Sequence, residues 1–495
     1  MVKNLSDGSD LIKVSFSKAI INDLWPKEGS EYQGYHDDIE ARCVYFAGSG
    51  RRTLIVALDI GILSRKRDHL LREEIAKRLN LSQEHVLVHC TQAHNAIPYH
   101  LVYLDKVAER VAEAVKPAIA DAREATISFA CVDVGGAFSV NRRKYVSDDL
   151  GVCTFWDGYR KEGDRADAAH LVADLRRSLL SHEPSNIYEL ESDKIPQSGG
   201  LSKVQGLEPV WYDRPADPLV HLLVFRTIAG APLGSLLRFS THVQTAVFPL
   251  QREKVHTADF PHYTRERLEA VLGGVAVFAS GPAGDVVPLQ EEWSWNEVKR
   301  YGTALADAAL AEFDRSRPLF LPLTRFRACS CEVDLPVRND MPSSIEEANR
   351  RAAIIREELN MTASYGASLR QIKRMADLFD HFQWSPAKLG RWNYLDPEEV
   401  LQHKVTIRIT GIALNDVVIL GMPGEAVCET SIWLRANSIG TRLLTLYDCN
   451  GDIGYMPESK DYLHGGYESA CSIIAPDGET YLRDGALALV RELLQ

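Results

Sequence analysis

The sequence predicts an α/β protein in which mixed sheets are flanked by helices, built as a single domain over residues 1–495. Apolar runs typical of strands alternate with segments of helical spacing in the first third of the chain, and the same alternation returns in the last quarter. Between them lies a pair of apolar runs typical of a hairpin. Because the sequence has neither an internal repeat nor a long flexible linker, we expect one integrated body.

The first third predicts a strand, a helix and a second strand. Residues 53–63 form a continuous apolar run rich in β-branched residues, which is typical of a strand covered on both faces. Ser64 can cap the following helix, in which apolar residues recur at helical spacing: Leu71, Ile75 and Leu79. An apolar run at 86–88 follows, and the short connection favours a right-handed crossover. Next come a helix with valines at 107, 111 and 115 and a strand near 126–134.

The middle and end of the chain are predicted from the same patterns. Apolar runs at 219–228 and 233–240, separated by Ala-Gly-Ala-Pro, predict a hairpin. Further helices are predicted near 262–272, 295–313, 425–437 and 479–494, and further strands at 275–279, 404–412, 416–421 and 441–447. The polar helical stretch within 340–400 is predicted to be an insertion or cap.

Composition and charge narrow the classes of partner. The net charge of -12, with no basic cluster, argues against a nucleic-acid partner. No stretch approaches the ~20 apolar residues of a membrane span, and the N-terminus lacks the apolar core of a signal peptide. The nine cysteines are scattered and odd in number, so we expect no disulfide framework. We therefore expect a cytoplasmic protein without stable membrane association that acts on a small molecule, and a homo-oligomer stays open.

Polar side chains directly follow several predicted strands. Alternation along the strand that begins at 86 would place Gln92 and His94 on the same side at its end. His242, Asp285 and Glu425 each follow another apolar run. Because open α/β sheets bind ligands at the carboxyl ends of their strands, we expect these side chains to converge in one crevice.

Simpler structural roles are open for the same kinds of residue. Asp259 precedes a helix that Pro261 can start, and it is placed to be the N-cap of that helix. Asp285 can close a tight turn. Glu425 can interact with the dipole of the predicted helix at 425–437, and this interaction contributes about 0.3–1 kcal/mol. The residues alone leave these alternatives undecided.

Short motifs follow one another in a recognisable order. They are Thr-Gln-Ala-His-Asn-Ala at 91–96, Asn-Arg at 141–142, Phe-Ser-Thr-His at 239–242, Thr-Ala-Asp at 257–259, Gly-Asp-Val-Val-Pro at 284–288, Pro-Gly-Glu at 423–425, and Tyr455, Tyr462, Tyr467 and Glu468. From about residue 10 to the C-terminus this order resembles the neutral/alkaline, non-lysosomal ceramidase family, in particular its N-terminal catalytic domain and bacterial relatives. The resemblance implies a ceramidase-like α/β catalytic domain without that family's C-terminal β-sandwich domain.

The resemblance also implies a metal site. Enzymes of this family are zinc amidases whose metal is held by two His, one Glu and one Tyr. The second His corresponds to His242, the carboxylate to Glu425 and the phenolate to Tyr455. The family's first His corresponds to Gln92, and His94 matches a His that lies beside the metal. The resemblance thus implies Zn²⁺ on His94, His242, Glu425 and Tyr455, with another divalent metal, or Gln92 as the first ligand, left open.

Further roles follow from the same resemblance. His94, Arg142 and Asp285 are implied to be catalytic. If His94 is not a ligand, it would move a proton or stabilise the transition state. Arg142 would bind a substrate oxygen or anion, with a surface ion pair as its alternative. Substrate contacts are implied for Gln92, Asn141, Asp259 and Tyr467. A serine of the family corresponds to Gly281, so a serine nucleophile finds no support at that position.

These inferences predict a zinc-dependent hydrolase, a ceramidase-like amidohydrolase, that cleaves an amide or related acyl bond of a small polar substrate with metal-activated water. One alternative is a metal-dependent enzyme acting on an ester, lactone or glycosidic bond of a sugar derivative. The other is a non-catalytic binding protein that lost its metal together with the first His.

Overall fold

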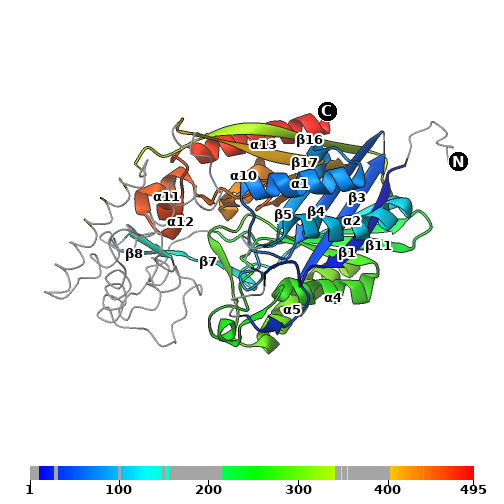
Figure 1. Ribbon diagram of the computed structural model, residues 1–495, viewed down its shortest axis with the longest axis horizontal. Helices are drawn as coiled ribbons and strands as arrows, with labels where there is room; N and C mark the ends of the chain where they lie inside the picture. Colours follow the sequence, from blue (N-terminus) through cyan, green and yellow to red (C-terminus); the bar gives the residue numbers. More distant parts are fainter. Residues whose placement is uncertain are drawn as a thin grey trace.

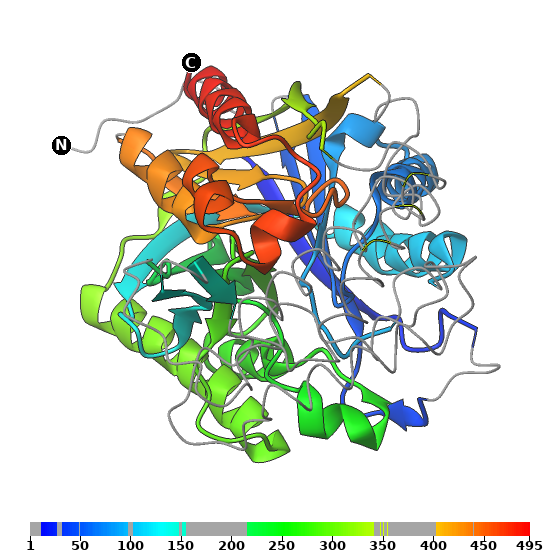
Figure 2. The same ribbon diagram turned by 90° about the vertical axis from the view of Figure 1, so that its left-hand side faces the viewer.

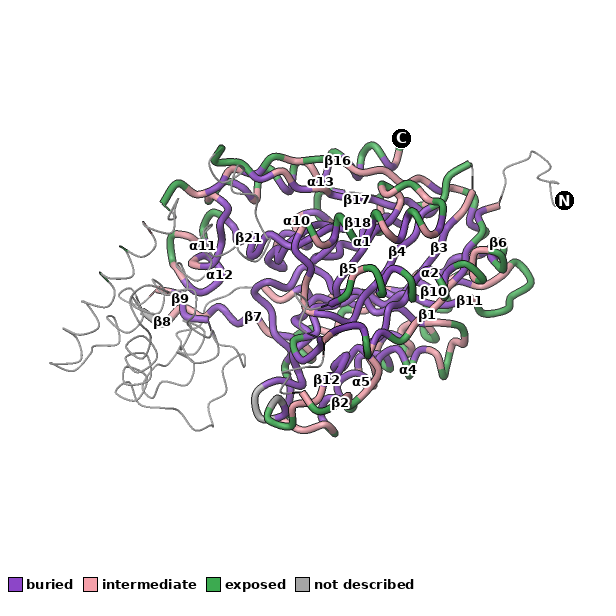
Figure 3. The backbone as a smooth tube through the Cα atoms, in the orientation of Figure 1, coloured by how far each residue is buried: buried purple, intermediate pink, exposed green. Residues whose placement is uncertain are grey.

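The described helices and strands form four layers, in which two sheets pack face to face between helices (Figure 1). The structure is a computed structural model and describes residues 11–26, 32–48, 50–97, 102–147, 151–154, 215–340, 402–438 and 440–495, with single residues 347, 350 and 354. Nearly all of the insertion or cap predicted within 340–400 lies outside these residues. Figure 3 shows that the strands are buried along most of their length, whereas the helices expose their outer faces.

The larger sheet has nine strands in the order β13-β11-β10-β6-β1-β3-β4-β5, with β15 paired to β6. Its strands are β1 (Lys13–Ile20), β3 (Glu40–Gly48), β4 (Arg51–Leu58), β5 (Val86–Cys90), β6 (Arg123–Asp133), β10 (Leu219–Thr227), β11 (Pro232–Phe239), β13 (Val275–Ser280) and β15 (Leu321–Pro322). β4 and β5 are parallel, as are β11 and β13, and the other pairs are antiparallel. The sheet is therefore mixed, as the sequence predicts.

Four helices cover the outer face of the larger sheet (Figure 1). They are α1 (Arg65–Leu79), α2 (Leu104–Ala120), α4 (Phe260–Leu272) and α5 (Trp295–Ser316). Their apolar faces pack on the strands in one core. Ser64 caps α1 through its hydroxyl, which accepts from the N–H of Arg67, as predicted. None of the helices in the described part of the chain is long and apolar enough to cross a membrane.

The smaller sheet contains β16 (Phe326–Pro336), β17 (Lys404–Leu414), β18 (Val417–Gly421) and β20 (Arg442–Leu446), in that order. Its outer face packs against α10 (Cys428–Asn437) and α13 (Gly478–Leu494). Its inner face shares a core with the larger sheet, in which Phe46 and Ile55 lie with Ile419 and Leu444. This contact between the two sheets forms the middle of the four layers.

Short strand pairs and two short α-helices lie outside the two large sheets. The pairs are β7 (Ser139–Asn141) with β14 (Val286–Pro288), β19 (Glu425–Ala426) with β21 (Tyr455–Met456), β8 (Arg143–Ser147) with β9 (Gly151–Thr154), and β2 (Gly34–Tyr35) with β12 (Val255–His256). The helices are α11 (Ser459–His464) and α12 (Tyr467–Cys471). Both helices lie at the same end of the molecule as β7 and β8 (Figures 1 and 2).

The helices and strands predicted within the described residues are present, although several of their ends differ. The strand predicted over 53–63 ends at Leu58. The sequence patterns did not predict β1, β3 and β16. β16 is half-buried along most of its length and contains charged residues, so its sequence lacks a continuous apolar run.

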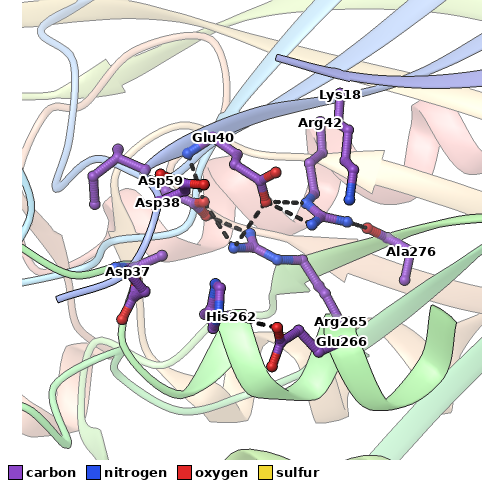
Figure 4. Close-up of polar contacts among 12 residues, drawn as sticks. Lys18, Asp37, Asp38, Glu40, Arg42, Asp59, His262, Arg265, Glu266 and Ala276 are labelled. Atoms are coloured by element: carbon purple, nitrogen blue, oxygen red, sulfur yellow. Dashed lines mark hydrogen bonds and ion pairs between the residues drawn. The ribbon is translucent and has the colours of Figure 1, made fainter. Parts of the chain in front are cut away.

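A buried ionic network attaches α4 to the larger sheet (Figure 4). Arg265 of α4 makes two hydrogen bonds to the carboxylate of Asp59, at 2.6 and 2.8 Å. On β3, Arg42 pairs with Glu40 at 2.5 Å and donates to the carbonyl oxygen of Ala276 on β13 at 2.7 Å. Both guanidinium groups are buried, so these partners replace the water that would otherwise stabilise their positive charges.

Candidate functional site

The predicted site lies where strands of both sheets reach their carboxyl ends. In the larger sheet, β5 runs into the loop that carries His94, and β11 runs into the loop that carries His242. In the smaller sheet, β18 leads into β19, whose first residue is Glu425. The loop after β13 joins β19, because the N–H of Gly284 donates to the carbonyl of Ala426 at 3.0 Å. Segments far apart in the sequence are thereby held together.

His242 and Glu425 form a buried pair at the centre of this region. Nε2 of His242 lies 3.4 Å from Oε2 of Glu425. Nδ1 of His242 lies 2.9 Å from the carbonyl oxygen of Val286, which can only accept, so Nδ1 carries the proton of that hydrogen bond. Burial alone would raise the pKa of Glu425, but the contact with His242 and the charge of Arg142 lower it on balance. Glu425 is therefore ionised at neutral pH.

Arg142 lies among the same side chains and is fully buried. Its Nη1 is 3.4 Å from Nε2 of His242, and its Nη2 donates to the hydroxyl of Tyr455 at 3.2 Å. Its Nε donates to Glu468 at 2.7 Å. Burial alone would lower the pKa of Arg142, but Tyr455 and Glu468 raise it on balance. The alternative of a surface ion pair for Arg142 is wrong, because its ion pair is buried.

Tyr455 begins β21 and lies beside Glu425, its partner in the parallel pairing of β19 and β21. Burial, followed by the charge of Glu425, raises the pKa of Tyr455 well above its usual range. The ring of Tyr467 packs edge-on against that of Tyr455, with the centroids 5.4 Å apart. The guanidinium of Arg142 lies 5.7 Å from the centroid of each ring. Tyr467 is thus placed to pack against Tyr455 and Arg142.

Gln92 and His94 both reach this group, although not by the predicted alternation. The strand ends at Cys90, and Gln92 has a φ of 66°, so the alternation of a strand does not extend to these residues. Nδ1 of His94 donates to the carbonyl oxygen of Gln92 at 2.8 Å, and the ring centroids of His94 and His242 are 5.3 Å apart. Oε1 of Gln92 accepts from the hydroxyl of Tyr447.

His94 differs from its neighbours because its side chain is exposed, whereas Gln92 and His242 are buried. Enough protein nevertheless surrounds the imidazole that desolvation, followed by the nearby His242, lowers the pKa of His94 to about 4. His94 is therefore neutral at pH 7. Its ring lies near the buried His242, yet its side chain is exposed to solvent.

The structure places Asp285 and Asn141 in supporting positions. One carboxylate oxygen of Asp285 accepts from the N–H of Cys428, the first residue of α10, at 2.8 Å, and the other accepts from Nδ2 of Asn141 at 2.6 Å. The carbonyl oxygen of Asp285 accepts from the N–H of Arg142 at 2.8 Å. All of these groups are buried. Through these hydrogen bonds Asp285 holds the backbone of Arg142 and the first residue of α10 in place. Both oxygens of its carboxylate already accept hydrogen bonds from the protein.

Asp259 is the N-cap of α4, which was the simpler of its two predicted roles. One carboxylate oxygen accepts from the N–H of Phe260 at 2.6 Å. The other accepts from the N–H of Ala246 at 2.8 Å. Since Ala246 lies in the loop that follows His242, Asp259 ties the start of α4 to that loop.

Gly281 has no room for a side chain such as that of serine. A Cβ at this position would overlap the guanidinium group of Arg238. Arg238 is buried and held by Asp217 at 2.8 Å and by the carbonyl oxygen of Thr445 at 3.0 Å. The structure therefore leaves no space for a serine at position 281.

Two residues of the group were not among the predicted site residues. Glu468 ends the motif that begins at Tyr455, and its ion pair with Arg142 makes it part of this group. Tyr447 ends an apolar run, and nothing in its local sequence indicates that its hydroxyl contacts Gln92. Both contacts join residues more than 300 positions apart, so local patterns could not reveal them.

The donor groups fit a divalent cation in kind. Oε2 of Glu425 is buried and takes part in no hydrogen bond with the described residues. In His94 and His242, Nδ1 is bound by a backbone carbonyl, the pattern that orients Nε2 of a histidine toward a metal. Within the described ranges, no three His, Cys, Asp or Glu side chains are grouped as a metal site. A metal site at His94, His242 and Glu425 would therefore need Tyr455 as a further donor. The positive charge that lies among these side chains in the structure is that of Arg142.

Comparison with known proteins identifies the fold. No protein-family model and no curated protein sequence matches the chain. It is similar to the crystal structure of neutral ceramidase from Pseudomonas aeruginosa, with a TM-score of 0.60 and 16% identity over 97% of this chain and 75% of that one. A structure described as ceramidase complexed with C2 gives a TM-score of 0.61 and 14% identity over 97% of this chain and 76% of the other. The chain therefore has the fold of the solved ceramidase structures, as its motifs predict.

Proposed function

We propose that the protein is a zinc-dependent hydrolase that cleaves an amide or related acyl bond of a small polar substrate. The observation that carries this proposal is the meeting of His94, His242, Glu425 and Tyr455 at the carboxyl ends of strands from both sheets. The shared fold with solved ceramidases supports a hydrolase. We place the activity in the cytoplasm and expect neither a nucleic acid nor a stable membrane contact; a homo-oligomer stays open.

The residues of the chain would hold the metal and supply the remaining groups. When bound by His94, His242, Glu425 and Tyr455, zinc would polarise the scissile carbonyl and lower the pKa of water toward about 7. Arg142 keeps a positive charge beside Glu425 and Tyr455, which favours negative charge on their oxygens. His94 is exposed, so a substrate could reach it, whereas His242, Glu425 and Tyr455 are buried.

A non-catalytic binding protein is the second candidate. It is favoured by the position of Arg142, whose guanidinium group already contacts His242 and Tyr455. A cation at this place can neutralise Glu425 without a metal. Hydrolysis of an ester, lactone or glycosidic bond would use the same donors as the amidase, and product analysis decides between these bonds.

The test is product analysis with zinc-reconstituted protein on panels of small amides, esters, lactones and glycosides. We expect release of an amine from amides, and loss of this activity in Glu425→Gln, which keeps the shape of the side chain but removes its charge. Glu332→Gln, on an exposed position of β16, is the matched control and should retain full activity. Turnover of glycosides or esters alone would replace the amidase, and the absence of turnover in every panel would favour the binding protein.

A further inference from the structure

The loop after β20 carries three buried polar side chains at alternate positions: Asp448, Asn450 and Asp452. Neither carboxylate oxygen of Asp448 hydrogen-bonds to any of the described residues. The same holds for Oδ2 of Asp452 and Oδ1 of Asn450. Because buried polar atoms are normally satisfied, these acceptor oxygens point to a ligand that supplies positive charge.

The backbone of this loop curls around Gly424. The N–H of Asp448 donates to the carbonyl oxygen of Gly424 at 3.2 Å, and the N–H of Gly424 donates to the carbonyl oxygen of Gly451 at 3.3 Å. The φ values of 48° at Asp448, 57° at Asn450 and 97° at Gly451 belong to this tight course. Both ends of the loop are bound to the same residue, which brings Asp448 and Asp452 near one another.

The loop is also bound to strands of both sheets. The N–H of Cys90, the last residue of β5, donates to the carbonyl oxygen of Asp448 at 3.0 Å. Nδ2 of Asn450 donates to the hydroxyl of Thr410 on β17 at 3.0 Å, which leaves Oδ1 as the atom without a partner. These contacts hold the loop between the two sheets and away from solvent.

The charges that act on the two carboxyl groups are negative. Burial, followed by the charges of Glu425 and Asp452, raises the pKa of Asp448 well above its usual range. Burial, followed by the charge of Glu425, raises the pKa of Asp452 to about 8. Either a bound cation or protonation of the carboxyl groups can compensate for this burial.

The oxygens are of the kind that calcium prefers. Carboxylate and amide oxygens at three alternate positions, in the pattern Asp-x-Asn-x-Asp, are the first three ligands of a calcium-binding loop. Ile453 stands where an EF-hand loop has glycine, so the likeness is confined to these three positions. Magnesium usually keeps several waters, whereas calcium accepts oxygens in flexible geometry, so a buried loop suits calcium better.

We infer that Asp448, Asn450 and Asp452 bind a calcium ion, which braces the loop before Tyr455 between the two sheets. The remaining ligands would be carbonyl oxygens of the surrounding loops. The set holds two carboxylates and one amide, so it differs from the groups of three His, Cys, Asp or Glu side chains that are absent among the described residues. None of its members is a proposed zinc ligand, so the inference goes beyond the proposed function.

The test is calorimetric titration of CaCl2 into the full-length chain, after treatment with EGTA and dialysis, for the wild type, Asp448→Asn and Asp452→Asn. We expect about one calcium per chain in the wild type and binding at least about tenfold weaker in each variant, because each loses a charged ligand and keeps the shape of the side chain. Asp416→Asn, which changes an exposed carboxyl group between β17 and β18, should bind calcium like the wild type.

Melting of the dialysed wild type gives a second measurement that needs no variant. CaCl2 should raise the melting temperature more than MgCl2 at the same concentration. A wild type that binds no calcium and whose melting temperature CaCl2 leaves unchanged would overturn the inference, and would mean that the two carboxyl groups are protonated. Calcium binding that persists undiminished in both variants would also overturn it, because the ion would then lie elsewhere.

Zinc uptake separates this inference from the proposed function. Asp448→Asn should lose calcium and still take up zinc, whereas His242→Ala should lose zinc and still bind calcium. A wild type that binds calcium but no zinc would overturn the proposed function and support the calcium site.

Discussion

Replacing Glu468 with glutamine should destabilise the protein strongly and in a pH-dependent way. The carboxylate is fully buried and pairs with Arg142 and Arg143, both at 2.7 Å, and it also accepts from the hydroxyl of Thr154 at 2.9 Å. Glu468→Gln keeps the size of the side chain and removes its charge. Two buried guanidinium groups then lose a counter-charge, which typically costs about 3–5 kcal/mol.

The pKa of Glu468 gives an independent magnitude. Burial alone would raise this pKa, but Arg142 and Arg143 lower it from 4.5 to about 2. A pKa lowered from 4.5 to about 2 corresponds to about 3 kcal/mol of stability. Because the folded-state pKa lies below the unfolded one, this contribution is fully present above about pH 5 and disappears as the pH falls toward 2.

The assay is chemical denaturation of the wild type and Glu468→Gln at several pH values. We expect the variant to be less stable by about 3 kcal/mol at pH 7, and the difference to shrink steadily below pH 5, since the wild type then protonates the same carboxyl. Glu332→Gln, at an exposed position, should differ from the wild type by less than about 0.5 kcal/mol. A difference that stays constant with pH, or one under about 1 kcal/mol at pH 7, would refute the ionic role of Glu468.

Three further predictions concern the fold and the metal. Gly281→Ser should lower stability by about 1–3 kcal/mol in thermal denaturation, because its Cβ would overlap Arg238. The variant should also show no reactivity toward serine-directed phosphonates. An unchanged melting temperature would contradict the overlap. Arg265→Met should cost about 3–5 kcal/mol by leaving Asp59 buried without its partner, and a loss within about 0.5 kcal/mol would contradict the network in Figure 4. Chelation of zinc should abolish hydrolysis and lower the melting temperature, which added zinc should restore; a melting temperature unaffected by chelator would argue against a bound metal.

Most of the fold was visible in the sequence, because its strands and helices carry strong local patterns. The run at 53–63 and the spacing of Leu71, Ile75 and Leu79 predict β4 and α1. β1 and β3 were missed because their sequences mix apolar with polar or charged residues. The packing of the second sheet on the first was also not predicted, since contacts such as those among Phe46, Ile419 and Leu444 join distant segments.

The candidate site was predictable to the extent that its residues follow apolar strands. His242 and Glu425 do so, and the structure brings them within 3.4 Å. The alternation expected for Gln92 and His94 was wrong, because the strand had already ended and the backbone of Gln92 turns into the left-handed region. The pairing of Arg142 with Glu468 has no local signal, so only the folded chain reveals it.

The most direct test of the central claim is elemental analysis of zinc in protein purified without chelator, for the wild type beside His242→Ala and Glu425→Ala. The account predicts about one zinc per chain in the wild type and its loss in both variants. Wild-type protein that contains no zinc and takes up none on incubation would contradict the proposed metal site, and would leave Arg142 as the cation that neutralises Glu425.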